Sequence, residues 1–425
     1  MTDDRATPSE SPGFATSELD YHLPDGMIAQ HPPARRDDAR LLVVDRAADR
    51  FDDARIVDLP ERLRPGDLVV LNDTRVLPAR FVARRRTGGA IDGLFVSEAA
   101  PGTWDVLLRG SKRLRAGETL SVAAEGDPVT LALVEHCGDG RWRVHVAPPE
   151  PVGAILERIG HTPLPPYIRR PSPDADGDAA DRGRYQTVYA QAPGAIAAPT
   201  AGLHLTDELL RRFERQGVDT CFVTLHVGVG TFKPISAATP AGHAMHAERF
   251  EFGPGAAAAV NACRERGGRV VAVGTTTVRV LESAATTASS SVAGVPGAID
   301  GTAATAGRTA AENAAAAERC TAAEARVPAA PSGPAQGPAG VGGGTAAGRP
   351  GLVLLPGCGT TDIFIYPPYR FRVADALLTN FHLPRSTLLA LVMAFAGVSL
   401  TRRAYQHAIS HGYRFYSYGD AMLIV

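Results

Sequence analysis

The segment Ala197-Ala-Pro-Thr-Ala-Gly-Leu-His-Leu-Thr-Asp-Glu-Leu-Leu210 carries the pattern around which the chain is organised. Small residues lead through His204 into an amphipathic helix, whose apolar side chains recur on one face. Thr206 is the expected N-cap of this helix. The next segment, Thr220–Gly228, is typical of a strand and carries a second histidine, His226. Two histidines around one helix–strand unit favour a polar pocket, although each histidine taken alone is equally compatible with a cap or a turn.

Length and composition bound the class of protein. A chain of 425 residues exceeds one ordinary domain, so two domains are expected. The 44% hydrophobic and 21% charged residues are typical of a globular enzyme. A net charge of -1 argues against a histone-like polycation but not against a local basic patch. The five cysteines are widely spaced and form no Cys-x-x-Cys, which disfavours disulfide, zinc-knuckle and iron–sulfur scaffolds and favours a reducing cytoplasm.

Two regions differ in composition from the expected folded part. Residues 1–20 are polar and acidic without an apolar stretch, which predicts a disordered tail and not a signal peptide. Residues 285–350 are rich in Ala, Gly, Thr, Ser and Pro and contain no aromatic residue, which predicts a flexible low-complexity insertion. The longest apolar run, Leu388–Gly397, is shorter than the roughly 20 residues that cross a bilayer. We therefore expect a cytoplasmic protein with no membrane association.

The order of strands and helices predicts the domain organisation. Over residues 66–150, short β-prone segments recur between Gly, Pro or Asp turns, at the spacing of a small antiparallel barrel. Those segments are Leu68–Leu71, Arg80–Ala83, Leu94–Val96, Trp104–Leu108, Thr119–Val122, Val129–Val134 and Trp142–Val146. In 21–65 and 151–425, by contrast, we expect a discontinuous α/β catalytic domain. The predicted fold is thus an α/β large domain, with a mixed or parallel sheet and flanking helices, into which a small antiparallel β-barrel is inserted.

Several local motifs indicate a functional role, and each also has an ordinary structural explanation. The strand Arg269–Val273 runs into Gly274-Thr-Thr-Thr277, and free N–H groups and hydroxyls at such a helix start attract carboxylates. Capping by threonine alone explains the same residues equally well. Lys112-Arg-Leu-Arg115 is either a phosphate-contacting loop or a charged edge strand. The polar residues of Gln30–Arg40 are compatible with a solvated loop holding local ion pairs.

Two common kinds of site are disfavoured. Gly228-Val-Gly230 lacks the third glycine of a nucleotide-binding loop, since position 233 is a lysine. The residues of His243-Ala-Met-His-Ala-Glu248 lack the His-Glu-x-x-His spacing and a nearby third histidine, so no metal is expected. They suit acid–base or hydrogen-bonding work better, because histidine titrates near neutrality.

Three long strings, Tyr185-Gln-Thr-Val-Tyr-Ala190, Ala198-Pro-Thr-Ala-Gly-Leu-His204 and Thr379-Asn-Phe-His-Leu-Pro384, resemble one family closely. It is the S-adenosylmethionine:tRNA ribosyltransferase-isomerase family of queuosine synthesis. The resemblance covers nearly the whole chain apart from the N-terminal tail and the 285–350 insertion. The chain departs from the family at Pro368, where glycine is usual, and at Leu205, where phenylalanine is common. The family's α/β domain with an inserted barrel agrees with the predicted fold.

The resemblance implies a reaction and its partners. The ribosyl group of S-adenosylmethionine is transferred and isomerised onto 7-aminomethyl-7-deazaguanine at the wobble position of a tRNA, giving epoxyqueuosine-tRNA, adenine and methionine. S-Adenosylmethionine is then a consumed co-substrate and no cofactor is expected; a monomer is expected. Two alternatives stay open: a transferase that uses S-adenosylmethionine with a different acceptor, and an RNA-binding relative without catalysis.

The implied chemistry selects candidate residues. A base must remove the proton at C5′ beside the sulfonium, and adenine must be stabilised as it leaves. The catalytic candidates are His204 or His226 for the base, and Glu248 or His246 for adenine departure. The donor-binding candidates are Thr200, Gly274, Thr275, Thr276, Arg279, Asp73, Asp362, Asn380 and His382. The tRNA-binding candidates, chosen as phosphate contacts, are Lys112, Arg113, Arg115, Arg169, Arg170 and Arg184.

Overall fold

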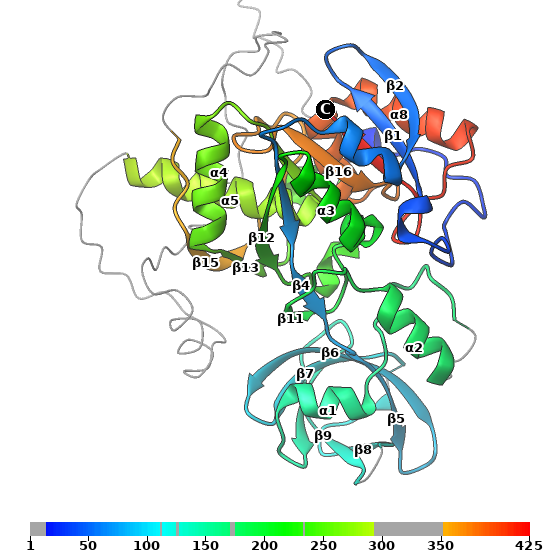
Figure 1. Cartoon of the computed structure of the whole chain (residues 1–425). Helices are drawn as coiled ribbons and strands as arrows, with labels where there is room; N and C mark the ends of the chain where they lie inside the picture. The colour runs from blue at the N-terminus through cyan, green and yellow to red at the C-terminus, as the bar shows by residue number, and fades with distance from the viewer. Residues whose placement is uncertain (1–13, 111–112, 125–126, 171–174, 233, 293–351) are drawn as a thin grey trace, which may run out of the picture.

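The computed structural model describes residues 14–110, 113–124, 127–170, 175–232, 234–292 and 352–425. A large sheet with helices on its faces forms one unit, and a closed barrel forms the other (Figure 1). The two units are joined where β4 (Thr74–Val76) pairs in parallel with β11 (Ala192–Ala195). The predicted fold, an α/β large domain with an inserted antiparallel barrel, is confirmed.

The large sheet has nine strands and is parallel at its centre. Its order is β15 (Gly357–Thr361), β13 (Glu248–Phe252), β12 (Asp219–Leu225), β3 (Leu68–Asn72), β14 (Val270–Val273), β16 (Ala376–Asn380), β17 (Ala421–Ile424), β1 (Arg40–Asp45) and β2 (Arg50–Arg55). Four neighbouring strands, β12, β3, β14 and β16, run parallel to one another. The strands β13 and β17 run antiparallel to their neighbours β12 and β16. All residues of β3, β14 and β16 are buried, as expected for strands covered on both faces.

Helices cover both faces of this sheet, and alternate side chains of one strand supply the two cores. Leu68 and Val70 belong to the core beneath α4 (Pro254–Glu265), α5 (Thr275–Val292), α7 (Thr387–Ala396) and α8 (Val398–Ser410). Val69 and Leu71 belong to the core beneath α3 (Asp207–Arg215) and the 3-10 helix η3 (Ile56–Arg62). The predicted N-cap of α3 is confirmed, since the Thr206 hydroxyl accepts the amide of Leu209 at 3.2 Å.

The barrel is closed by six antiparallel strands in the order β10-β7-β6-β5-β8-β9. Its strands are β5 (Arg80–Arg85), β6 (Ala90–Ala100), β7 (Thr103–Leu108), β8 (Thr119–Val122), β9 (Val129–His136) and β10 (Arg141–Ala147). Phe81 and Trp104 are fully buried inside it, and the apolar face of α1 (Val152–Ile159) packs against the same core. The predicted segment at Leu68–Leu71 pairs with β12 and β14 instead, so the predicted start of the barrel at residue 66 is wrong and the barrel begins at β5.

Two predicted flexible regions prove to be partly ordered. The tail was expected to extend to residue 20, but Thr16–Leu19 form a 3-10 turn and Leu19 is fully buried in the main core. The insertion was expected from residue 285, but α5 continues to Val292 and Ala285 is fully buried. Residues 1–13 and 293–351 lie outside the described residues. In the described part of the chain, no single helix is long and apolar enough to cross a membrane.

Candidate functional site

One edge of the large sheet gathers most of the predicted site residues. Because parallel strands end together, Asp73 after β3, His226 after β12, Gly274 after β14 and Asn380 at the end of β16 meet at this edge. The strand β13 runs antiparallel to β12 and therefore starts at this edge. Its first residue, Glu248, lies here as well. We call this border of the sheet the carboxyl edge. β4, which leads to the barrel, and its parallel partner β11 start from it, so it lies on the barrel side of the sheet (Figure 1).

His204 and Asn380 are in direct contact at this edge. The side-chain amide of Asn380 donates to Nε2 of His204 at 3.1 Å and to the carbonyl of Tyr416 at 3.2 Å. Since an amide nitrogen can only donate, Nε2 of His204 is the acceptor and the ring proton sits on Nδ1. Burial, and then the positive charges of Arg414 and Arg36, lower the pKa of His204 to about 4. His204 is therefore a neutral ring whose available lone pair is already used.

The turn that holds His204 depends on a glycine. His204 ends the 3-10 helix η5 (Thr200–His204), in which every residue but Thr200 is buried. A methyl group at Gly202 would lie 2.0 Å from the hydroxyl oxygen of Tyr189. Tyr189 belongs to the Tyr185–Ala190 string, so two of the three family-like strings pack together here. This packing fixes the position from which His204 reaches Asn380.

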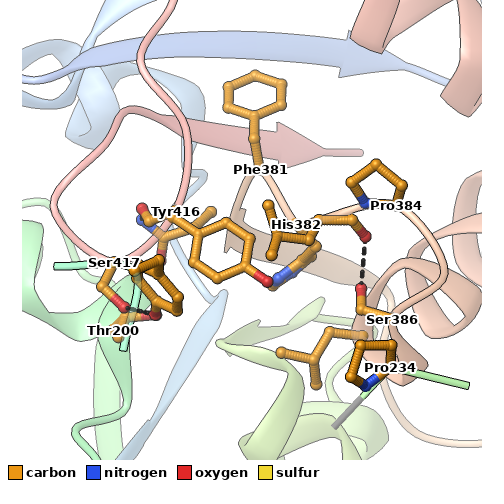
Figure 2. Close-up of a pocket in the computed structure, with 12 residues that line it drawn as sticks. Thr200, Pro234, Phe381, His382, Pro384, Ser386, Tyr416 and Ser417 are labelled. Atoms are coloured by element: carbon orange, nitrogen blue, oxygen red, sulfur yellow. Dashed lines mark hydrogen bonds between the residues drawn. The ribbon is translucent and has the colours of Figure 1, made fainter. Parts of the chain in front are cut away.

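A pocket opens beside Asn380. Its lining comprises Tyr167, Thr200, Pro234, Asn380, Phe381, His382, Leu383, Pro384, Ser386, Leu388, Tyr416 and Ser417, several of which are labelled in Figure 2. No Asp, Glu, Lys or Arg is among these described residues. Nε2 of His382 pairs with the Thr379 hydroxyl at 2.7 Å, and burial lowers the pKa of His382 to about 3. Oδ1 of Asn380 is buried and has no partner among the described residues. We call this lining the donor pocket, because the predicted donor-binding residues Thr200, Asn380 and His382 are part of it; it is part aromatic and contains no Asp, Glu, Lys or Arg.

Tyr416 in this pocket has an unusual backbone. Its φ is +75°, the left-handed region that non-glycine residues avoid at a cost of about 1–3 kcal/mol. The amide of Tyr416 donates to the carbonyl of Phe381 at 3.1 Å, and its ring packs edge-on to Tyr167 at 4.0 Å between centroids. These contacts hold the strained residue in the pocket wall. Such strain is concentrated at functional sites.

A second group lies where β3 and β12 end. The Thr224 hydroxyl donates to Asp73 at 2.6 Å, and burial raises the pKa of Asp73. Nδ1 of His226 pairs with the Thr74 hydroxyl at 2.8 Å. A methyl group at Gly194 would lie 2.7 Å from this nitrogen, so the strand β11 passes directly over the ring. His226 is thus half-buried and oriented, at the same edge as Asn380.

A third group is built around a buried ion pair. Arg279 of α5 pairs with Glu248, and both side chains are about 4% exposed. The other oxygen of Glu248 accepts the amide of Gly228 at 2.7 Å, and Arg279 also donates to the carbonyl of Thr361 at 3.2 Å. Glu248 is therefore a carboxylate with occupied oxygens and not an open acid. The predicted neighbours His246 and Asp362 are both exposed.

The start of α5 was predicted to bind the donor. Gly274 has φ +89°, which suits glycine, and it turns the chain from β14 into the helix. Thr275 and Thr276 are buried, and the Thr276 hydroxyl accepts the side-chain amide of Asn72 at 3.2 Å. These residues lie at the carboxyl edge, but none of them lines the donor pocket.

The tRNA candidates fall into two sets. Arg113 and Arg115 are exposed between β7 and β8 of the barrel, while Lys112 lies outside the described residues. Arg169 is exposed too. Arg170 is held by two 2.8 Å hydrogen bonds to Asp181. Arg184 donates to backbone carbonyls, those of Ala34 (at 3.2 Å) and Pro33.

The sequence did not single out the segment Tyr416–Tyr418, and it named Arg36 only as one of the polar residues of Gln30–Arg40, with a solvated loop as the alternative. Arg36 donates to the carbonyls of Leu203 at 3.0 Å and Gly183 at 2.7 Å, so it is not part of a merely solvated loop. The density of polar residues in Gln30–Arg40 was the available signal.

A separate group at the surface, Asp53, His407 and His411, lies close enough together to hold a metal ion, but Asp53 already pairs with Arg40 at 3.2 Å.

Comparisons with known proteins give a single result. A family model described as "Queuosine biosynthesis protein" matches residues 16–323 and 335–424. A relative from Geobacter sulfurreducens is 43% identical over 412 residues, covering 96% of this chain and 99% of its own. A relative from Acidithiobacillus ferrooxidans is 45% identical over 411 residues, covering 96% and 97%. Both are named S-adenosylmethionine:tRNA ribosyltransferase-isomerase. A crystal structure of S-adenosylmethionine tRNA ribosyltransferase from Thermotoga maritima is 30% identical, with coverage of 96% and 100% and a TM-score of 0.45.

Proposed function

The chain belongs to the queuosine biosynthesis protein family, and we propose that it is an S-adenosylmethionine:tRNA ribosyltransferase-isomerase. It transfers and isomerises the ribosyl group of S-adenosylmethionine onto 7-aminomethyl-7-deazaguanine at the wobble position of tRNA. The products are epoxyqueuosine-tRNA, adenine and methionine. The observation that carries this conclusion is the full-length match to enzymes of this name, at 41–45% identity.

The donor site of the proposal is the carboxyl edge. The donor pocket offers an uncharged, part-aromatic space with hydroxyl and amide groups, which suits part of a nucleoside. Thr200, Asn380 and His382 line it directly. Asp73, Gly274, Thr275 and Thr276 lie along the same edge and remain candidates for contacts to the donor. Arg279 and Glu248 would support this part of the edge as a buried ion pair, while the exposed Asp362 remains the weakest candidate.

The proton at C5′ needs a base at this edge. The sulfonium acidifies this position, and the base takes the proton while the electron pair stays on carbon. We assign the base to His226, because the Thr74 hydroxyl beside its Nδ1 can accept as well as donate, whereas the Asn380 amide can only donate to His204, whose pKa is lowered to about 4. His204 then becomes a positioning residue. His246 remains the candidate for assisting adenine departure, since both oxygens of Glu248 are engaged.

The roles of the two histidines are separable by experiment. Replacing His226 by Gln keeps the approximate size and hydrogen bonding of the side chain but removes the basic ring nitrogen, so kcat should fall by a factor of about 10²–10⁴ with little change in KM. His204→Gln should raise the KM for S-adenosylmethionine as well, because it disturbs Asn380. Equal effects of both variants on kcat alone would remove the distinction.

Free adenine is the product that separates the candidate functions. The wild-type enzyme should release adenine from S-adenosylmethionine only with tRNA that carries the modified base. Release with another acceptor would indicate a different transferase, and tRNA binding without release would indicate a non-catalytic relative. The proposal also includes a cytoplasmic monomer without a resident cofactor, which predicts full activity after dialysis against chelator and a single monomer-sized peak on gel filtration.

A further inference from the structure

A second pocket adjoins the donor pocket and shares Ser417 with it. Its lining comprises Pro32, Pro33, Arg36, Arg184, Leu203, His204, Ser417 and Tyr418. The His204–Asn380 hydrogen bond links the two pockets, since Asn380 lines the first and His204 the second. We propose that this second pocket, the arginine pocket, binds an anionic oxygen group of a substrate, a carboxylate or a phosphate.

Two guanidinium groups lie in this pocket without an acidic partner. Arg36 and Arg184 donate only to backbone carbonyls in the described part of the chain, and neither forms an ion pair there. A guanidinium has five N–H groups, so donors remain after these bonds. Burial, and then repulsion by Arg184, lower the pKa of Arg36, and the negative charge of Asp207 opposes them in part. An anion between the two arginines would offset their repulsion.

An unused hydroxyl adds an independent observation. Tyr418 is 2% exposed, and its hydroxyl is buried without a partner among the described residues. Burying a hydroxyl unpaired costs free energy. Among the described tyrosine hydroxyls that are buried without a partner, those of Tyr185, Tyr189 and Tyr418, only that of Tyr418 belongs to the lining of this pocket. A phenol beside two arginines is the donor set that a carboxylate or phosphate accepts. The pocket therefore holds both the charge and the neutral donor of an anion site.

The ligand class follows from this chemistry. Planar guanidinium groups recognise carboxylate and phosphate through paired hydrogen bonds, and a cation would be repelled. Resting on the proposed function, two sources are available: the carboxylate of the methionine part of S-adenosylmethionine and a phosphate of the tRNA backbone. Because Ser417 lines both pockets, either anion would be anchored directly beside the donor pocket. This anchoring would couple substrate binding to the Asn380–His204 contact.

Tyr418→Phe is the sharpest variant for the test. It removes one hydroxyl that has no partner among the described residues, so the unliganded protein should unfold at an unchanged temperature. Inorganic phosphate should raise the unfolding temperature of the wild type, and the rise should be smaller for Tyr418→Phe and for Arg184→Gln. The matched control is Arg211→Gln, which removes an exposed arginine on α3 that pairs with Glu208. This arm needs no turnover, so it stands apart from the proposed activity.

Direct binding to the full-length chain then identifies the source. A Kd for S-adenosylmethionine that rises roughly tenfold in Tyr418→Phe, with tRNA binding unchanged, assigns the carboxylate. Weaker tRNA binding by Arg184→Gln, with a slope of log Kd against log salt concentration that is smaller by about 0.9, assigns a phosphate of the tRNA. Unchanged phosphate protection together with unchanged Kd values for both substrates would overturn the anion site. If the wild type releases no adenine but phosphate protection is lost in the variants, the anion site stands and the proposed function fails.

Discussion

The side-chain amide of Asn380 donates to Nε2 of His204 at 3.1 Å, across 176 residues of sequence. Asn380 ends a parallel strand, and His204 ends a 3-10 turn of the Ala197–Leu210 segment. Burial keeps the His204 ring neutral and the bond fixes its orientation, while Oδ1 of Asn380 is buried without a partner among the described residues. The site is therefore built on a contact between two of the family-like strings.

The buried histidines predict a loss of stability in acid. The folded-state pKa of His204 is lowered to about 4 and that of His382 to about 3, from a usual value of 6.5. Below pH 6.5 the unfolded chain therefore binds protons that the folded chain excludes. The free energy of unfolding should fall as pH drops from 6.5 towards 4, by up to about 1.4 kcal/mol per pH unit for each group.

Urea unfolding across this pH range measures the effect. His204→Gln and His382→Gln should each flatten the pH dependence, whereas His22→Gln, which changes an exposed side chain, should leave it as in the wild type. Parallel curves for the wild type and both buried-site variants would refute the assignment of neutral rings.

The buried pair of Glu248 and Arg279 predicts a strongly asymmetric stability effect. Glu248→Gln should cost about 3–5 kcal/mol, because it leaves a buried guanidinium charge unpaired. Replacing both residues by Met should cost less than this single change, since no buried charge remains. The exposed Glu208→Gln serves as control and should change little. A double variant less stable than Glu248→Gln would show that the pair itself supplies the stability.

Gly202 is predicted to be essential for the turn that holds His204. Gly202→Ala places a methyl group 2.0 Å from the Tyr189 hydroxyl and should cost about 1–3 kcal/mol. Tyr189→Phe removes that oxygen, so the double variant should recover part of the loss. Gly255→Ala on the exposed face of α4 meets no atom within 4 Å and should stabilise by about 0.5–1 kcal/mol. Equal unfolding midpoints for the two alanine variants would contradict the steric argument.

Local chemistry predicted the elements better than their assembly. The N-cap Thr206 and the barrel strands follow from capping and alternation, which depend on neighbours in sequence. The strand at Leu68 was recognised but placed in the wrong sheet, because its partners are β12 and β14, far away in the chain. The sequence predicts a disordered tail at Leu19, because an isolated apolar residue in a polar segment does not indicate that its side chain will be buried in a core.

The same limit applies to the site. The resemblance pointed to His204, Asn380 and His382, and the structure places Asn380 and His382 in the lining of one pocket and His204 in the lining of the adjoining one. Sequence alone could not show that Asn380 uses the lone pair of His204, nor that Glu248 is tied to Arg279. Arg36 looked like a loop residue because its partners are backbone carbonyls, which leave no pattern of side chains to read.

The exposed barrel arginines predict part of the tRNA footprint. Changing Arg113 and Arg115 together to Gln should weaken tRNA binding and reduce the salt slope by about 0.9 for each phosphate that the variant no longer neutralises. The Kd for S-adenosylmethionine should stay unchanged, because these residues lie on the barrel. Arg211 and Arg215 on α3 provide a matched double control. If the salt dependence of tRNA binding equals that of the control, the loop of Arg113 and Arg115 does not contact the tRNA.

Release of adenine in a single turnover tests the central claim most directly, with Asn380→Ala compared with Asn261→Ala. Asn261 is a fair match, because its amide also bonds to backbone, at 2.9 Å to Leu354, but it lies on α4. With both variants shown to be folded, Asn380→Ala should release adenine at least about 10²-fold more slowly, because the donor would lose its positioning. Asn261→Ala should match the wild type. Equal rates for the two variants would contradict the placement of the donor site at the Asn380–His204 contact.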